Sequence, residues 1–340
     1  VYKRQTYALQ DLKNGHYQFA KSSTWRPGFH TLGDYRQTEP LKALFFPARE
    51  FIGKWKDPSS REPMPERIVF GVKNCDLSSL AIFDQVFLQG VCPDPYYAEA
   101  RAKTILVSSD CNSQLDVCFC PAVGEQPYAT KGFDINVALT PSGFVIESGT
   151  EPGEKLLQSA QPYLEPANEE LLNSLKTQRA ERYRELVELT QAHGLEPGTD
   201  FRAAIETTFE SGLWSDFAED CVECGACNFI CCTGHCLLLA DGMDAEGTAA
   251  RTKLWDACLY SGCAATAGGG NPRPLRAERL RNRVDKKFSY FPQVMDRYAC
   301  DGCGRCTEAC IANIDIRDVL RRAVDECDAL HAHSSDHRAN

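Results

Sequence analysis

The sequence lacks any apolar run long enough to cross a bilayer, and its 37 Lys and Arg residues are outnumbered by 47 Asp and Glu residues. A membrane-spanning helix needs about 20 consecutive, mostly apolar residues, so we expect no transmembrane segment. The net charge of −10 argues against nucleic-acid binding as the main activity, because phosphate backbones attract basic surfaces. No signal peptide is recognisable, although the chain starts at Val1 rather than Met.

Two nucleotide-binding motifs are also missing. No G-x-G-x-x-G follows a predicted strand, and no G-x-x-x-x-G-K-[ST] occurs anywhere in the chain. We therefore expect nucleotide chemistry on a partner protein.

Cysteine, by contrast, is abundant, with 18 residues in a chain of 340. A secreted disulfide scaffold would be short and would spread its cysteines through loops. Here they cluster at intervals of two and three residues, which is typical of metal ligation in a reducing compartment. The cytoplasm is the expected location.

The pattern of the chain predicts an α+β protein. Residues 1–155 read as an α/β domain, with β-rich runs at residues 68–72, 104–107, 135–139 and 144–146 and a helix over residues 77–87. Residues 156–199 form a helical linker. Its charged helix covers residues 168–193 and ends at Gly194. We interpret residues 200–330 as a mainly α-helical, ferredoxin-like domain and residues 331–340 as a flexible tail.

The strongest motif is a four-cysteine run, C-x-x-C-x-x-C-x-x-x-C, that occurs twice in the predicted ferredoxin-like domain. The first run is Cys221, Cys224, Cys227 and Cys231, and the second is Cys300, Cys303, Cys306 and Cys310. Three closely spaced cysteines on a loop can reach three irons of one cube, while the fourth points away and ligates the other cluster. This crossing predicts two [4Fe–4S] clusters. Cluster 1 is held by Cys221, Cys224, Cys227 and Cys310, and cluster 2 by Cys300, Cys303, Cys306 and Cys231.

The sequence does not decide one ligand of cluster 2. The bacterial ferredoxin run has proline after its fourth cysteine, but Cys232 and Ile311 stand there in this chain. Either Cys231 or Cys232 supplies the crossing ligand. A pair of structural zinc sites also uses C-x-x-C spacing, but two complete runs of identical spacing favour iron–sulfur clusters.

A third [4Fe–4S] site is predicted in the N-terminal domain from Cys75, Cys111, Cys118 and Cys120. Cys75 and Cys111 each follow a predicted strand, and loops after adjacent strands often converge on one edge of a sheet. Because the C-x-C spacing is awkward for two ligands of one cube, a second possibility is that Cys118 or Cys120 is structural and that an aspartate, Asp76, Asp110 or Asp116, replaces it as a ligand. Buried, redox-inert cysteines are the alternative.

About 70 residues separate the two runs, more than a minimal ferredoxin needs. This insert carries a candidate basic helix with Arg273, Arg276, Arg279, Arg281 and Arg283. Such a cationic stretch would raise the reduction potential of a nearby cluster or bind an acidic surface of a partner protein. An ordinary amphipathic helix with solvated arginines explains the pattern equally well.

Several further stretches resemble one protein family. They include residues 40–50, 71–76, 94–97, 118–120 and 271–276, together with both cysteine runs. The chain resembles the iron–sulfur subunit of anaerobic sulfite reductase and the β subunit of the NAD(P)-linked sulfhydrogenases, which are [NiFe] hydrogenases. Family members read roughly Cys-Pro-Thr-Cys-Tyr-Cys where this chain has Cys231-Cys232-Thr233-Gly234-His235-Cys236.

The resemblance implies a non-catalytic electron-transfer subunit in a hetero-oligomer. It would relay electrons between a flavin subunit that oxidises NAD(P)H, carrying FAD, and a catalytic subunit with siroheme or nickel–iron. An electron-input subunit of a flavin module that feeds heterodisulfide reductase is one alternative. A catalytic iron–sulfur protein that binds substrate at the N-terminal cluster is another, and a zinc-dependent interaction module is the third.

Overall fold

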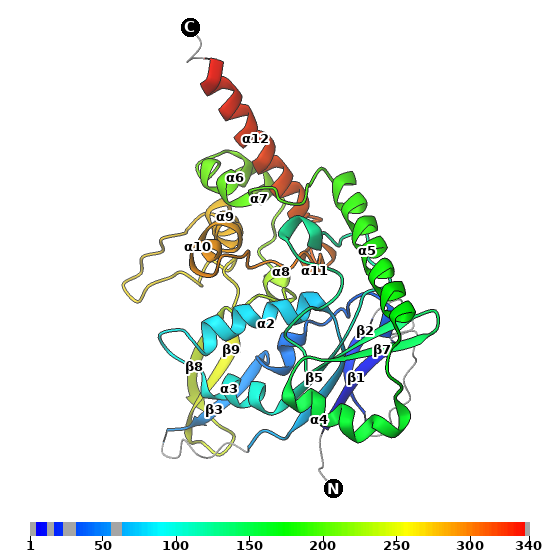
Figure 1. The fold of residues 1–340 in the computed structure, drawn as a ribbon. Helices are drawn as coiled ribbons and strands as arrows, with labels where there is room; N and C mark the ends of the chain where they lie inside the picture. Colours follow the sequence, from blue (N-terminus) through cyan, green and yellow to red (C-terminus); the bar gives the residue numbers. More distant parts are fainter. Residues whose placement is uncertain (1–4, 12–16, 23–31, 56–62, 337–340) are drawn as a thin grey trace.

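The computed structural model describes residues 5–11, 17–22, 32–55 and 63–336 (Figure 1). Within these residues, the larger sheet has the strand order β2–β1–β4–β5–β6–β7. Strands β1, β4, β5 and β6 run parallel, and β2 and β7 pair antiparallel at the two edges. The strands are β1 Gln5–Asp11, β2 Tyr17–Ser22, β4 Arg67–Val72, β5 Thr104–Ser109, β6 Ile135–Thr140 and β7 Gly143–Ser148.

Two helices, α2 (Asn74–Phe87) and α3 (Pro95–Ala102), connect β4 to the parallel strand β5. Leu80, Phe83 and Phe87 of α2 are buried and recur at intervals of three and four residues, which gives the helix one apolar face. That face shares a core with Val69 and Leu106 of the sheet. The strands and the helix predicted for the first 155 residues are present, and the α+β class is confirmed.

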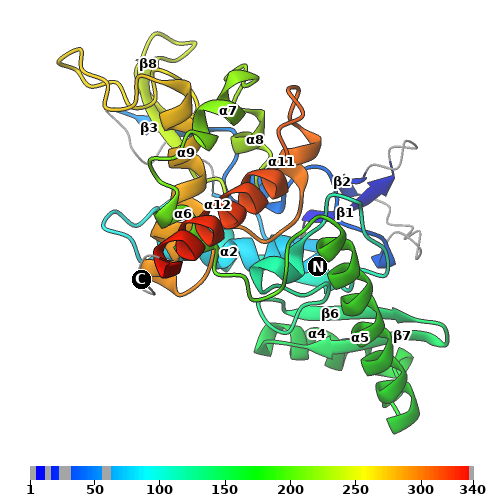
Figure 2. The same cartoon turned by 90° about the horizontal axis from the view of Figure 1, so that it is seen from above.

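The helical part has a second core, which lies beside the sheet (Figure 2). It contains Phe201, Trp214, Phe288 and Leu320, all buried. A residue from another part of the chain, Phe119, belongs to the same core. The helices of this part are α6 Phe201–Thr207, α7 Leu213–Glu219, α8 Ala226–Phe229, α9 Arg276–Asp285, α10 Phe291–Met295, α11 Arg305–Glu308 and α12 Ile316–Asp336.

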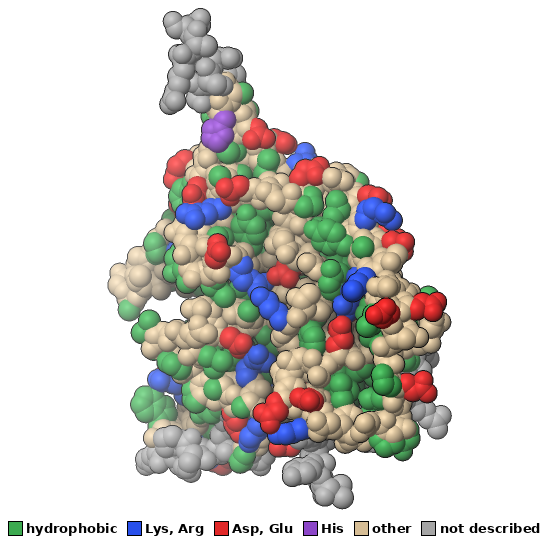
Figure 3. All heavy atoms as spheres, in the orientation of Figure 1, with side chains coloured by type: hydrophobic (Ala, Val, Ile, Leu, Met, Phe, Trp, Pro, Cys, Tyr) green, Lys and Arg blue, Asp and Glu red, His purple; other side chains and the backbone are tan. Residues whose placement is uncertain are grey.

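The long helix α12 extends away from the rest of the chain toward the C-terminus (Figure 1). It runs to Asp336, six residues into the segment that the sequence predicts as a flexible tail, and residues 337–340 lie outside the described residues. On the face shown in Figure 3, acidic and basic side chains are interspersed.

The predicted linker contains α4 (Glu151–Ala160) and α5 (Glu169–Ala192). Gly194 follows α5 with φ +73°, as the predicted helix end requires. The buried Leu175 of α5 packs against the sheet residues Ala138 and Val145. Helix α5 is therefore attached to the sheet along part of its length.

A hairpin in the insert was not predicted. Strands β8 (Leu237–Met243) and β9 (Ala249–Trp255) pair antiparallel, and β9 also pairs with β3 (Arg49–Lys54) of the N-terminal part. The hairpin is an addition to the mainly helical structure predicted for residues 200–330. The resulting sheet joins two segments that lie about 200 residues apart in the sequence.

Candidate metal centres

The two cysteine runs have the same backbone conformation. Each contains a short helix, α8 or α11, that carries the third cysteine and begins after a glycine in the left-handed region, Gly225 (φ +73°) or Gly304 (φ +70°). Two residues earlier, Glu223 (φ +58°) and Gly302 (φ +64°) are also left-handed. The repeated spacing in the sequence therefore corresponds to a repeated loop-and-helix unit.

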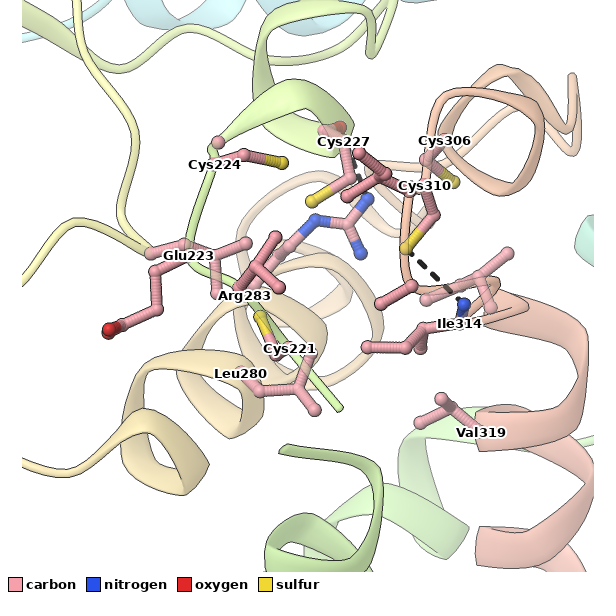
Figure 4. Close-up of a pocket in the computed structure, with 16 residues that line it drawn as sticks. Cys221, Glu223, Cys224, Cys227, Leu280, Arg283, Cys306, Cys310, Ile314 and Val319 are labelled. Carbon is pink, nitrogen blue, oxygen red and sulfur yellow. Dashed lines mark hydrogen bonds between the residues drawn. The ribbon is translucent and has the colours of Figure 1, made fainter. Parts of the chain in front are cut away.

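The first thiol pocket, shown in Figure 4, is lined by Cys221, Cys224, Cys227 and Cys310. These are the four residues predicted for cluster 1, and Cys306 also lines the pocket. It encloses about 540 Å³ of empty space, part of it open to solvent. The structure thus brings the last cysteine of the second run to the first three cysteines of the first run.

The wall of this pocket is mainly apolar, with Leu280, Ile314 and Val319 among its residues. Burial raises the pKa of Cys227 to about 11. Two groups in the pocket interact with its sulfurs. The Ile314 N–H donates to Cys310 Sγ at 3.3 Å, and the Arg283 guanidinium lowers the pKa of Cys227.

The central cysteine group consists of Cys231, Cys300, Cys303 and Cys306, the residues predicted for cluster 2, together with Cys232. Charges on Cys231, Cys303 and Cys306 act on one another, and Cys300 interacts with Cys231 and Cys306. The Cys232 Sγ lies 3.7 Å from Cys303 Sγ. Because both Cys231 and Cys232 reach this group, the geometry leaves the choice of crossing ligand open.

A partly buried lysine contacts the central cysteine group. Lys287 Nζ donates to Cys231 Sγ at 3.3 Å and to Thr233 Oγ1 at 2.7 Å. Burial alone would lower the pKa of Lys287, but the Cys231 and Cys300 sulfurs raise it above its ordinary value. Lys287 lies in a π-helical turn, Lys286–Tyr290, between α9 and α10, and such turns are frequent at functional sites.

The N-terminal thiol pocket is lined by Cys75, Cys111, Cys118 and Cys120, the four residues predicted for a third cluster. Cys75 is in the first turn of α2, which begins directly after β4, and Cys111 follows β5. Since β4 and β5 are parallel neighbours, their carboxyl ends meet at one edge of the sheet. Cys303 of the central group lines the same pocket.

Two glycines allow the loop with Cys118 and Cys120 to approach the second run. A Cβ at Gly302 would lie 2.4 Å from the backbone of Cys120, and one at Gly304 would lie 2.3 Å from the Val117 carbonyl oxygen. The Phe119 N–H donates to the Gly302 carbonyl at 2.8 Å. The two cysteine-bearing segments are therefore in backbone contact.

Two of the nearby aspartates are ion-paired with arginines, and Asp76 Oδ2 also accepts from Cys75 Sγ at 3.8 Å. Asp76 Oδ2 accepts from Arg305 at 2.7 Å, and Asp110 Oδ2 accepts from Arg179 at 2.7 Å. Asp116 is exposed. Ser113 also lines the N-terminal thiol pocket, and its buried Oγ has no hydrogen-bond partner among the residues that the structure describes.

The arginines of α9 are not all solvated. Arg279 and Arg283 are only 3% and 5% exposed. Arg283 donates to the Cys227 carbonyl at 3.3 Å, and Arg279 pairs with Glu223. The interpretation of α9 as an ordinary helix with solvated arginines is therefore wrong for these two residues. The sequence alone does not reveal their contacts, because they are made with residues far along the chain.

The donor set fits iron–sulfur clusters. Burial raises the pKa of Cys75, Cys120 and Cys300 well above the ordinary range, so these thiols need nearby positive charge to become thiolates. Cluster irons supply that charge and take cysteine thiolate as their usual ligand. Among the described residues, no three His, Cys, Asp or Glu side chains form a group that could hold a single metal ion.

Comparison with known proteins agrees with this chemistry. Residues 220–314 match the model of a 4Fe-4S dicluster domain. The chain is 31% identical over 253 residues to sulfhydrogenase 2 subunit beta of Pyrococcus furiosus, a match that covers 74% of this chain and 72% of that protein. No solved structure matches significantly. Among the described helices, none is both long enough and apolar enough to span a membrane.

Proposed function

Since the chain belongs to the iron–sulfur subunit family of the sulfhydrogenase β subunits, we propose that it relays electrons through three [4Fe–4S] clusters. Cluster 1 would be held by Cys221, Cys224, Cys227 and Cys310. Cluster 2 would be held by Cys300, Cys303 and Cys306 with Cys231 or Cys232, and cluster 3 by the four cysteines of the N-terminal thiol pocket. In this role the chain is an electron-transfer subunit without a catalytic site of its own.

One observation carries the proposal. The central cysteine group shares Cys306 with the first thiol pocket and Cys303 with the N-terminal thiol pocket. Sites that share lining residues are close neighbours, and electron transfer between clusters requires such proximity. The order of transfer is therefore first pocket, central group and N-terminal pocket, in either direction.

The first thiol pocket offers a place for exchange with a partner. Cys224 is exposed, and the flanking side chains of Val222 and Ile311 are 62% and 76% exposed. Apolar side chains around an opening are typical of protein contact sites. The partners that fit this family are a subunit that oxidises NAD(P)H with FAD and a catalytic subunit with nickel–iron or siroheme, in a hetero-oligomer.

When bound, the clusters supply one-electron redox chemistry. The chain's own residues exclude water with apolar walls, donate N–H groups to sulfur and place buried cations beside it. Hydrogen bonds to sulfur and nearby positive charge both stabilise the reduced, more negative state of a cluster.

The substitution Cys300→Ser tests the relay at its middle. Cys300 lines neither flanking pocket, so we expect the variant to lose about one cubane of iron, roughly four irons per chain. Reduction of the N-terminal site by electrons entering at the first pocket should slow at least about tenfold, measured by EPR after rapid mixing. The matched control is Cys327→Ser, in the core around α12.

Transfer at the wild-type rate in Cys300→Ser, with the iron lost, would contradict the proposed order. The same iron assay distinguishes the two candidates for the crossing ligand. Only one of Cys231→Ser and Cys232→Ser should lose the central cluster.

A further inference from the structure

A third pocket contains thiols that no cluster of the proposed relay uses. It is lined by Cys236 and Cys258 together with Cys231, and it encloses about 370 Å³ of space that opens to solvent. Cys231 of the central cysteine group thus borders this pocket as well. A group that enters from solvent can therefore approach the two thiols through this opening.

The β8–β9 hairpin holds the two thiols together. Cys236 immediately precedes β8, and Asp256 immediately follows β9. The Asp256 N–H donates to the Cys236 carbonyl at 3.0 Å, next to the last strand pair, Leu237 and Trp255. Cys258 follows two residues later, so its position opposite Cys236 is set by strand register.

The surroundings distinguish the two thiols. Asn228 Nδ2 donates to Cys258 Sγ at 2.9 Å, and Arg283 Nε donates to Asn228 Oδ1 at 3.1 Å. The hydrogen bond from Cys236 lowers the pKa of Cys258 to about 6 and raises that of Cys236. Cys258 is therefore suited to attack as a thiolate, and Cys236 retains the proton.

The pocket also attracts anions. Arg283, Lys286 and Lys287 line it, and no Asp or Glu does. The imidazole of His235 is neutral, because burial lowers its pKa to about 4. A substrate that carries carboxylates would be favoured by this charge.

We propose that Cys236 and Cys258 form a redox-active dithiol that exchanges with small anionic disulfides. The Cys258 thiolate attacks one sulfur of the substrate, and a mixed disulfide forms as the substrate's S–S bond breaks. The leaving thiolate takes the proton of Cys236. The Cys236 sulfur then attacks Cys258 Sγ and releases the second substrate thiolate.

The products are one thiol, one thiolate and the Cys236–Cys258 disulfide. Two electrons and one proton restore the thiol and thiolate of the pair. The electrons come from the relay proposed above, and this last step alone rests on the proposed function.

Glutathione disulfide is a suitable probe for the anaerobically purified full chain. After incubation, free thiols are alkylated and the peptides are analysed by mass spectrometry. We expect a Cys236–Cys258 disulfide and a loss of alkylation at both residues of at least about tenfold. Cys236→Ser should stop at a glutathione adduct on Cys258, and Cys258→Ser should form no adduct in the pocket.

Cys327→Ser is the control and should react like the wild type. Unchanged alkylation of Cys236 and Cys258 in the wild type would overturn the proposal. So would a loss of iron in both pocket variants but not in the control, because the two sulfurs would then be metal ligands.

A separate experiment tests whether the relay supplies the electrons that reduce the Cys236–Cys258 disulfide. The disulfide should be reduced again by dithiothreitol in both the wild type and Cys300→Ser, which supports the dithiol itself. Electrons delivered through the relay should reduce it only in the wild type. Equal recovery in both proteins would reject the relay step and leave the exchange chemistry standing.

Discussion

At the scale of single residues, buried and half-buried cations lie beside the cysteine sites. Lys287 contacts Cys231, Arg283 lies among Cys227, Cys231 and Cys306, and Arg36 Nε donates to the Cys303 carbonyl at 2.5 Å. Arg36 and Arg283 are buried, and Lys287 is half-buried. Burying a charge is unfavourable unless it is compensated, so these side chains indicate negative charge on the sulfurs in the working protein.

Replacing Lys287 by Met should lower the reduction potential of the central cluster. The ammonium stabilises the more negative, reduced state, and a unit charge at this separation is worth on the order of 100 mV in a partly screened interior. A redox titration followed by EPR measures the shift. Lys287→Arg, which keeps the charge, and Lys155→Met on the exposed surface of α4 should both stay near the wild-type value, and a wild-type potential in Lys287→Met would exclude this role.

His235 should make the fold sensitive to acid. Burial lowers its pKa to about 4, whereas an unfolded histidine has a pKa of about 6.5. The unfolded state therefore takes up the proton first as pH falls, and this residue alone removes about 3 kcal/mol of stability between pH 6.5 and pH 4. Denaturation of wild type and His235→Asn across this range tests the slope, which should be shallower in the variant.

At the scale of elements, the second cysteine run is fixed to the N-terminal part by a buried ion pair. Arg305 of α11 and Asp76 of α2 are 1% and 0% exposed and lie 2.7 Å apart. Asp76 also accepts from the Leu41 N–H at 2.9 Å and from Gln37 at 3.0 Å. The pair joins two helices that both begin next to candidate cluster ligands.

Breaking this pair from either side should be severe. Asp76→Ala or Arg305→Ala leaves one buried charge without its partner, which costs about 3–5 kcal/mol. Chemical denaturation of the anaerobic chain measures the loss. Arg251→Ala, which breaks an exposed pair with Asp241, should change the midpoint little, and an equal effect of all three variants would refute the special role of the buried pair.

The sequence predicted four of the nine described strands and helix α2, but it missed β1, β2, β3 and the β8–β9 hairpin, and it did not reveal many of the contacts. Strands β4 to β7 were predictable because their apolar runs are bounded by turn residues, and the convergence of Cys75 and Cys111 followed from parallel pairing. The hairpin was missed because β8, Leu237–Met243, combines three exposed or half-exposed leucines with Asp and Gly, a pattern without a buried face. The partners of Arg283 and Arg305 are set by tertiary contacts that spacing does not encode.

At the scale of the whole molecule, the thiol sites lie where the parts of the chain meet. Phe119, between Cys118 and Cys120, is buried in the helical core. The first thiol pocket is built from both cysteine runs, and the N-terminal pocket from residues of the sheet part and of the second run. Cluster binding and the packing of the whole chain are therefore coupled.

Removal of the clusters should consequently destabilise the entire chain. A ligand that binds only the folded state stabilises it, and its loss here leaves thiol-lined voids between the packed parts. After the iron is removed anaerobically with a chelator, we expect the midpoint of thermal unfolding to fall by about 10 °C or more. Circular dichroism measures this midpoint for both helix and sheet. A loss of helix signal with an unchanged sheet transition would show that the two parts are stable independently.

The position of Cys310 in the first thiol pocket has a consequence for synthesis of the protein. The three cysteines of the first run that line that pocket leave the ribosome 83 to 89 residues earlier than Cys310, roughly 4–18 seconds at ordinary elongation rates. During that interval the nascent chain presents an incomplete set of thiols. With the ligand set proposed for cluster 1, insertion of that cluster in its final form would wait until translation is nearly finished, and a carrier that protects the waiting cysteines would act on the nascent chain.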